Sequence, residues 1–223
     1  MIKNKNIVIF GSSSELAGEF IKQLDDTNTI YTISLKNSKK ITHLQISDYL
    51  GSIDDIIKFI SPITNPIVIF FNGYLAENRP TQYPSSNEII KTLDINYVIP
   101  YKFTEIIISK NIKIEKFIYI SSFAAGKQRY KNFIYGYSKK LLEESIQSLE
   151  LNSYLLIRFG KIDTLMSQNH KRSIFDIDKE LASSILIKVI PSKQGIAYPN
   201  ISTKILSILI KMLPKQVIKY FKI

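Results

Sequence analysis

Residues 6–18, NIVIFGSSSELAG, decide the fold of this chain, because an apolar run ends there in a glycine and a helical pattern follows at once. The run predicts a buried strand over Asn6–Phe10. A glycine at a strand–helix turn lets the backbone approach a pyrophosphate, and the free N–H groups of the helix attract the anion. The same letters also fit an ordinary helix start, in which Ser13 or Ser14 is the cap.

Beyond this turn, short apolar runs alternate with longer stretches of helical period. Strands are predicted over Asn6–Phe10, Thr29–Ser34, Thr42–Ile46, Ile67–Phe71, Lys116–Ser121, Tyr154–Arg158 and Gly195–Tyr198. Helices are predicted over Glu15–Leu24, Ser52–Ile60, Glu88–Lys110 and Gly136–Leu149. This alternation predicts the α/β class: a single Rossmann-type, doubly wound parallel sheet with helices on both faces. Ligands are then expected at the carboxyl ends of the strands.

Length and composition bound the kind of protein. A chain of 223 residues fits one domain with a sizeable core. The absence of cysteine excludes disulfides and thiolate sites, and only His43 and His170 could supply imidazole, so no metal site is predicted. We find no secretory signal and no uncharged apolar run of about 18 residues, and therefore expect a cytoplasmic location.

The formal net charge of +11 favours binding of an anionic partner. Nucleic acid, lipid headgroups and phosphorylated small molecules all meet that description. The lysines are scattered, however, and no nucleic-acid-binding motif is present, so no nucleic-acid partner is predicted.

The loop after the second strand is rich in lysine, with Lys36, Lys39 and Lys40 and no acid. In a Rossmann unit this position meets the adenosine ribose, where an acid suits a free 2′-hydroxyl and a base suits a 2′-phosphate. The loop therefore favours NADP(H) over NAD(H). A solvated lysine loop is the alternative interpretation.

A second motif follows the fifth strand. That strand ends in Ser121 and Ser122, and thirteen residues after Ser122 comes Tyr135, with Lys139 four residues further on. At this spacing the phenol and the ammonium lie one helical turn apart on one face. A neighbouring ammonium favours the phenolate, so such a tyrosine can exchange a proton with a carbonyl or alcohol oxygen near neutral pH.

Taken in order, these features resemble the short-chain dehydrogenase/reductase superfamily over residues 5–166. Phe71-Asn72-Gly73 stands where the family has its Asn-Ala-Gly turn, and Asn96 where it has the fourth catalytic member. Residues 158–164, RFGKIDT, look like the family's Pro-Gly…Thr segment beside the nicotinamide.

The resemblance implies a role for each residue. Tyr135 would be the general acid in reduction, and Lys139 would lower its pKa and bind the nicotinamide ribose. Ser122 would hold the substrate oxygen, and Asn96 would position a water for proton relay. The residues expected to contact the cofactor are Gly11, Ser13, Ser14, Glu15, Leu16, Lys36, Asn72, Gly73, Tyr135, Lys139, Gly160, Ile162 and Thr164.

The chain also departs from the family pattern. Glu15 and Ala17 replace the second and third glycines of the pyrophosphate turn, Phe159 replaces the usual proline, and Gln45 stands where many relatives have an adenine-contacting aspartate. None of these departures removes a predicted catalytic group. Because some Rossmann proteins keep the fold and lose turnover, a non-catalytic dinucleotide-binding regulator of the same fold is the alternative function. The segment from Met166 to Asp178 is expected either to cover the substrate, with His170, Lys171, Arg172 and Phe175, or to be a surface loop.

Residues 1–200 are predicted to form the catalytic domain and residues 201–223 a basic, amphipathic helical extension. This extension suits the inner face of an anionic membrane, and equally suits packing on the domain or on a second subunit in a homodimer. Its layout is similar to the branch that includes the ketoreductase of decaprenylphosphoryl-arabinose synthesis. By that resemblance, the small-molecule carbonyl substrate would be a keto-sugar on a nucleotide or a polyprenyl phosphate.

Overall fold

The computed structural model describes residues 1–38, 42–76, 84–126, 132–168 and 176–214. Its main sheet has seven parallel strands in the order β3-β2-β1-β4-β5-β6-β9. The strands are β1 Asn6–Phe10, β2 Thr29–Ser34, β3 Thr42–Gln45, β4 Ile67–Phe70, β5 Lys116–Ser122, β6 Tyr154–Phe159 and β9 Gly195–Ala197. The helices are α1 Glu15–Gln23, α2 Ile53–Ile60, α3 Ser86–Leu93, α4 Ile99–Ser109, α5 Phe133–Ser148, α6 Lys179–Val189 and α7 Ile201–Met212.

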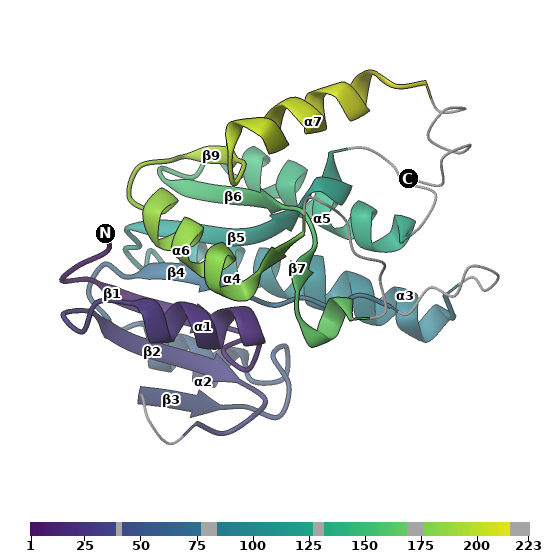
Figure 1. The fold of residues 1–223 in the computed structure, drawn as a ribbon. Coiled ribbons are helices and arrows are strands. Elements are labelled where there is room, and N and C mark those ends of the chain that lie inside the picture. The colour runs from purple at the N-terminus through teal and green to yellow at the C-terminus, as the bar shows by residue number, and fades with distance from the viewer. Residues whose placement is uncertain (39–41, 77–83, 127–131, 169–175, 215–223) are drawn as a thin grey trace.

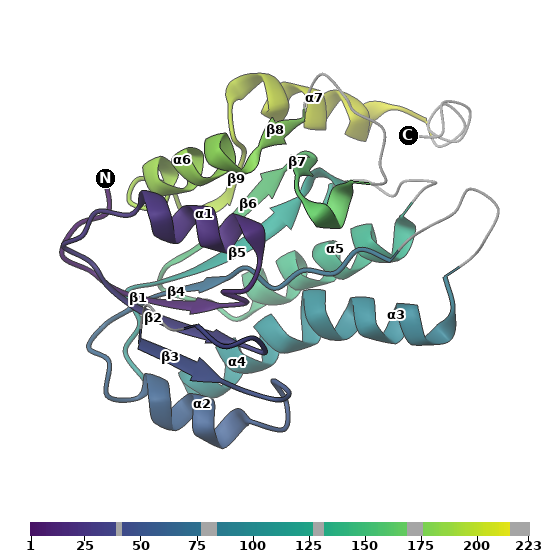
Figure 2. The same ribbon diagram turned by 60° about the horizontal axis from the view of Figure 1, so that its bottom comes forward.

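Helices cover both faces of the sheet, as Figures 1 and 2 show. Successive side chains of a strand point to opposite faces. Ile7 and Ile9 of β1 accordingly pack with α1 and α6, whereas Val8 and Phe10 pack with α2 and α4. Both faces are apolar because both are covered, and this explains the uninterrupted Ile/Val/Phe runs in the sequence.

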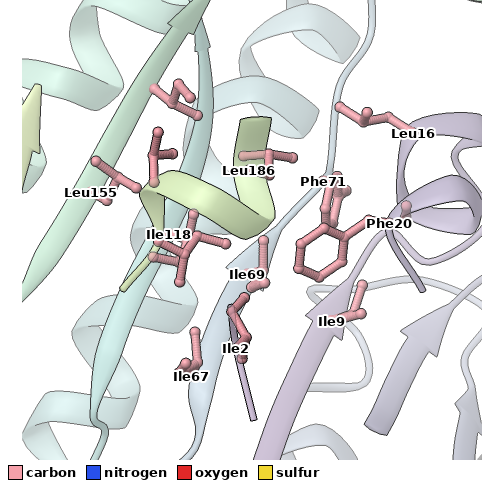
Figure 3. Packing of buried hydrophobic residues seen from close by; sticks show 14 of the residues in the cluster. Ile2, Ile9, Leu16, Phe20, Ile67, Ile69, Phe71, Ile118, Leu155 and Leu186 are labelled. Carbon is pink, nitrogen blue, oxygen red and sulfur yellow. The ribbon is translucent and has the colours of Figure 1, made fainter. Parts of the chain in front are cut away.

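Figure 3 shows the core between the sheet and the layer of α1 and α6. The rings of Phe20 from α1 and Phe71 from the end of β4 lie 5.4 Å apart between centroids. Ile69, Ile118 and Leu186 fill the neighbouring positions and are buried. This layer fixes the start of α1 against the end of β4, where the first predicted motif lies.

The predicted doubly wound sheet is confirmed, and each of its strands begins and ends within one residue of the predicted bounds. The prediction of one helix over Glu88–Lys110 is wrong, because a π-helical turn over Asp94–Val98 separates α3 from α4. Pro100 follows this turn and has no N–H to donate, so the regular i→i−4 pattern cannot pass through it. We did not predict α6 or the two-residue strands β7 Ile162–Asp163 and β8 Ile177–Asp178, which pair in a separate small sheet.

The C-terminal extension contains α7, which lies along the β9 edge of the sheet in Figure 1. α7 ends at Met212, two residues before Pro214. The second half of the predicted helix pair, residues 215–223, lies outside the described residues. Within the part of the chain that the structure describes, no helix is long and apolar enough to cross a membrane.

Candidate active site

The turn after β1 lies directly against the end of β4. Gly11 has φ +72°, in the left-handed region that glycine adopts without strain. A β-carbon on Gly11 would lie 2.9 Å from the backbone nitrogen of Asn72, closer than such contacts occur. The Gly11 N–H donates to the Tyr49 hydroxyl at 2.9 Å and to the Ile33 carbonyl at 3.0 Å. Glycine is therefore needed here both for the turn and for the close approach.

A cleft of about 660 Å³ opens at the carboxyl ends of β1 and β4. The predicted residues that line it are Gly11, Ser13, Ser14, Asn72 and Gly73. Ser14 also caps α1, since its hydroxyl accepts from the Ala17 N–H at 3.1 Å. The side-chain oxygen of Asn72 is buried and accepts no hydrogen bond from the described residues, so it has an acceptor position for a ligand donor.

A second hollow of about 240 Å³ adjoins the same turn from the side of β2. Ser12, Ser13, Ser34 and Lys36 are among the residues that line it. Hydroxyls and an ammonium in one hollow suit an anion such as a phosphate. Lys39 and Lys40, the other lysines of the predicted basic loop, lie outside the described residues.

Helix α5 carries Tyr135 and Lys139, and Lys139 is almost completely buried. Its Nζ donates to the Ile120 carbonyl at 2.9 Å and approaches the Asn72 carbonyl at 3.5 Å. The same Nζ lies 6.0 Å from the centre of the Tyr135 ring. Burial lowers the pKa of Lys139 to about 8, although the nearby Glu143 carboxylate raises it.

The start of α5, which carries Tyr135, is in contact with the turn that follows Ser122. Ser122 ends β5, and its hydroxyl accepts from the Ala124 N–H at 3.2 Å. A β-carbon on Gly136, the residue after Tyr135, would lie 2.9 Å from the Ala124 carbonyl oxygen. The start of α5 therefore approaches the Ser122 turn as closely as its backbone allows. Ser122, Tyr135 and Lys139 do not line the larger cleft. Asn72, which does line it, connects the cleft to Lys139, because its carbonyl oxygen lies 3.5 Å from the Lys139 Nζ.

Asn96 lies in the π-helical turn and is fully buried. Its Oδ1 accepts from the Tyr74 N–H at 2.8 Å, and its Nδ2 donates to the Tyr74 carbonyl at 2.8 Å and to the Ser138 hydroxyl at 3.1 Å. The side chain thus joins the segment after β4 to α5. Its amide groups are occupied by these contacts.

Two predicted cofactor residues have other contacts. The Glu15 carboxylate accepts from the Leu165 N–H at 2.6 Å and pairs with Lys179 at 3.3 Å, and the Leu165 contact lowers its pKa. The side chain of Leu16 is part of the core between α1 and the sheet. Leu16 could therefore meet a cofactor only through its backbone.

The segment after β6 brings the remaining predicted residues to the same end of the sheet. Gly160 follows β6, Ile162 lies in β7, and Thr164 precedes a short 3₁₀ helix over Leu165–Ser167. Met166 in that helix lines the larger cleft and lies 3.3 Å from the position of a β-carbon on Gly73. Residues 169–175, which include the predicted lid residues His170, Lys171, Arg172 and Phe175, lie outside the described residues.

Several residues near the site were missed by sequence reasoning. Asp48 lines the cleft, three residues after Gln45, which does not line it. The hydroxyl of Tyr49 accepts from Gly11 and donates to the Ile33 carbonyl at 3.2 Å, and burial raises its pKa. Asp48 and Tyr49 come shortly after the end of β3. That position, at the carboxyl end of a predicted strand, was the sequence signal that could have identified them.

A buried ion pair was also missed. Arg158 of β6 donates to the Glu143 carboxylate of α5, with Nε 2.9 Å from Oε1, and Ser121 donates to the same carboxylate. The Arg158 Nη1 donates to the Tyr198 hydroxyl at 2.9 Å. Glu143 is one helical turn after Lys139, so this network holds the helix that carries the predicted catalytic pair.

Comparison with known proteins gives matches in structure. No family model and no curated protein sequence matches the chain. A short chain dehydrogenase from Burkholderia cenocepacia, solved with NADP, has a TM-score of 0.76 at 14% identity and covers 95% of this chain and 99% of its own. The carbonyl reductase Sniffer of D. melanogaster has a TM-score of 0.69 at 16% identity and covers 89% and 97%.

A UDP-N-acetylglucosamine 4-epimerase from Methanobrevibacter ruminantium, solved with UDP-N-acetylmuramic acid, is also similar, with a TM-score of 0.66 at 16% identity. It covers 88% of this chain and 76% of its own. These likenesses show that the chain has the fold of the short-chain dehydrogenases/reductases, and they confirm the predicted resemblance at the level of the fold.

Proposed function

We propose that this chain is an NADP(H)-dependent short-chain oxidoreductase that reduces a carbonyl to an alcohol, with Tyr135 as the proton donor. One observation carries the proposal: a buried lysine, Lys139, lies beside the Tyr135 ring and bonds the end of β5, next to a cleft at the carboxyl ends of the strands. An ammonium buried beside a phenol indicates a chemical role, because core packing alone does not need a charged group there.

The residues of the cleft fit a dinucleotide. Ser13 and Ser14, at the start of α1, line the cleft, and the N–H groups in the first turn of a helix attract a pyrophosphate. The buried Asn72 oxygen, which accepts from none of the described residues, suits a hydroxyl or amino donor of the cofactor. When bound, the nicotinamide would supply the hydride.

Lys36 supports a preference for NADP(H). Its hollow combines an ammonium with the hydroxyls of Ser12 and Ser13 and lies beside the proposed pyrophosphate turn, as a 2′-phosphate requires. The Burkholderia neighbour was itself solved with NADP.

The chain's own residues divide the reaction between them. Lys139, mostly protonated at pH 7 with a pKa of about 8, favours the phenolate and helps Tyr135 to transfer its proton to the substrate oxygen. Ser122 would donate to that oxygen as negative charge develops. The Asn96 amide is already bonded to Tyr74 and Ser138, so we assign Asn96 a positioning role and not a direct hold on water.

For the substrate we propose a keto-sugar on a nucleotide or a polyprenyl phosphate. The net charge of +11 favours a phosphorylated substrate. The epimerase neighbour shares the fold and was solved with a nucleotide sugar. A cytoplasmic location and a homodimer are the further predictions for this enzyme.

The first test is a fluorescence titration of the purified chain with NADPH and NADH. We expect NADPH to bind at least tenfold more tightly. The second test is turnover of nucleotide keto-sugars by the wild-type chain and by Tyr135→Phe, which should bind NADPH normally and lose at least a thousandfold in kcat. Failure to bind either dinucleotide at millimolar concentration would refute the oxidoreductase. Normal NADPH binding without turnover across a broad carbonyl panel would favour the non-catalytic regulator.

A further inference from the structure

Helix α7 presents an apolar face to solvent. Ile201, Ile205, Ile208, Leu209 and Met212 are 77, 52, 48, 55 and 76% exposed. At about 3.6 residues per turn these five positions fall within an arc of about 100° on one side of the helix. A contiguous apolar face of this kind marks an interaction surface more often than isolated exposed side chains do.

The opposite side of α7 is fixed to the domain by polar contacts. Thr203 and Ser207 are buried, at 7 and 5% exposure. Asn200 caps the helix, since its Oδ1 accepts from the Thr203 N–H at 2.8 Å. The Ser207 hydroxyl lies 3.2 Å from the Tyr198 hydroxyl, which accepts from Arg158. These contacts set the rotation of α7 about its axis, so the apolar arc faces outward because of how the helix is held.

The charge of the extension indicates what covers this face. Residues 201–223 contain five lysines and no aspartate or glutamate. Lys204 is exposed and follows the first member of the apolar arc by three residues. A second copy bound through its own extension would add further lysines and no acid, which charge repulsion opposes. An anionic lipid surface offers both a hydrocarbon layer for the isoleucines and negative headgroups for the lysines.

We propose that α7 docks the protein on an anionic membrane surface, with Ile201, Ile205, Ile208, Leu209 and Met212 inserted at the interface. The helix has 12 residues, and no described helix can span a bilayer. It therefore lies in the plane of the interface and does not cross it. This proposal is independent of the reaction proposed above, because no residue of the docking face belongs to the candidate site.

The test is flotation of the full-length wild-type chain with vesicles of phosphatidylcholine alone or with 30% phosphatidylglycerol. We expect binding to the anionic vesicles, at least tenfold weaker binding to the neutral ones, and loss of binding in high salt. Ile205→Ser/Leu209→Ser should lower the partition coefficient at least tenfold. Lys204→Gln should lower it about fivefold, since each lysine near an anionic surface contributes about 1 kcal/mol.

Ile108→Ser/Leu141→Ser is the matched control, because these side chains are 39 and 40% exposed on α4 and α5. The control should bind vesicles as the wild type does. Circular dichroism and NADPH titration of each variant report folding and the cofactor site separately. No binding to anionic vesicles, or equal loss in the control, would overturn the proposal. So would a dimer in light scattering that Ile205→Ser/Leu209→Ser converts to a monomer, because the face would then be a subunit interface.

Discussion

Replacing Lys139 by methionine should abolish turnover and yet stabilise the protein at neutral pH. The pKa of Lys139 is about 8 in the folded chain against an ordinary value of 10.5. This pKa is lower by about 2.5, and at about 1.4 kcal/mol per pH unit burying the charge costs about 3.5 kcal/mol. The lost hydrogen bond to the Ile120 carbonyl offsets about 1 kcal/mol of this. Methionine, unbranched and similar in length, should therefore add about 2.5 kcal/mol to the free energy of unfolding at pH 7.

The stability difference between Lys139→Met and the wild type should depend on pH. Below pH 8 Lys139 is protonated in both states, and the full cost of the buried charge is present. Between pH 8 and 10.5 the unfolded chain binds more protons than the folded one, so the stability of the wild type rises with pH. The advantage of the variant should therefore shrink above pH 8, by at most about 1.4 kcal/mol per unit. The proposed reductase activity should fall over the same range, as Lys139 loses its charge.

The measurement is urea unfolding at pH 7, 8, 9 and 9.5, followed by circular dichroism because the chain has no tryptophan. Lys140→Met is the control, since Lys140 is the adjacent residue and its side chain is half exposed in a surface pair with Glu144. It should change stability by less than about 0.5 kcal/mol and leave turnover intact. A Lys139→Met chain that is less stable than the wild type at pH 7, or whose difference from the wild type does not vary with pH, would refute the reasoning.

Three further outcomes are expected. Arg158→Met should lower the free energy of unfolding in urea by about 3–5 kcal/mol, because it leaves the buried Glu143 carboxylate without its arginine partner. Adding Glu143→Leu should recover at least half of this loss, and no recovery would mean that the broken ion pair is not its cause. Gly136→Ala should lower kcat about a hundredfold and keep the NADPH affinity within threefold of the wild type, because the new β-carbon would displace the Ala124 carbonyl. An unchanged kcat would contradict the close approach of α5 to the turn after Ser122. Lys36→Glu should weaken NADPH at least tenfold in a fluorescence titration and NADH less than threefold; equal weakening of both would place the 2′-phosphate elsewhere.

The main sheet could be predicted from the sequence because its strands are buried on both faces. The run Ile67–Phe70 is apolar at every position, so its limits can be read without knowing its neighbours. Helix α6 was harder to recognise because its buried side includes Ser183 as well as Ala182 and Leu186. The cap at Asp178, whose carboxylate accepts from the Leu181 N–H at 2.6 Å, was a signal that sequence reasoning did not use.

Contacts between side chains of the candidate site could be predicted most directly where the residues are close in sequence. Tyr135 and Lys139 share one helix, so their proximity follows from spacing alone. The pairing of Glu143 with Arg158 depends on the register of β5 and β6 and on the rotation of α5, which local pattern does not determine. The contacts of the Glu15 carboxylate with Leu165 and Lys179 likewise join residues 150 or more positions apart.

The missed ion pair bears directly on the proposed chemistry. Lys139, Glu143 and Arg158 are all nearly inaccessible to solvent, and among these three residues two positive charges face one negative charge. An uncompensated buried charge is costly, and an anion beside it lowers that cost. The Tyr135 ring lies 6.0 Å from the Lys139 Nζ, so in the proposed reaction its phenolate would be such an anion. The proton transfer proposed for Tyr135 would therefore draw on the positive charge that α5 and β6 bury.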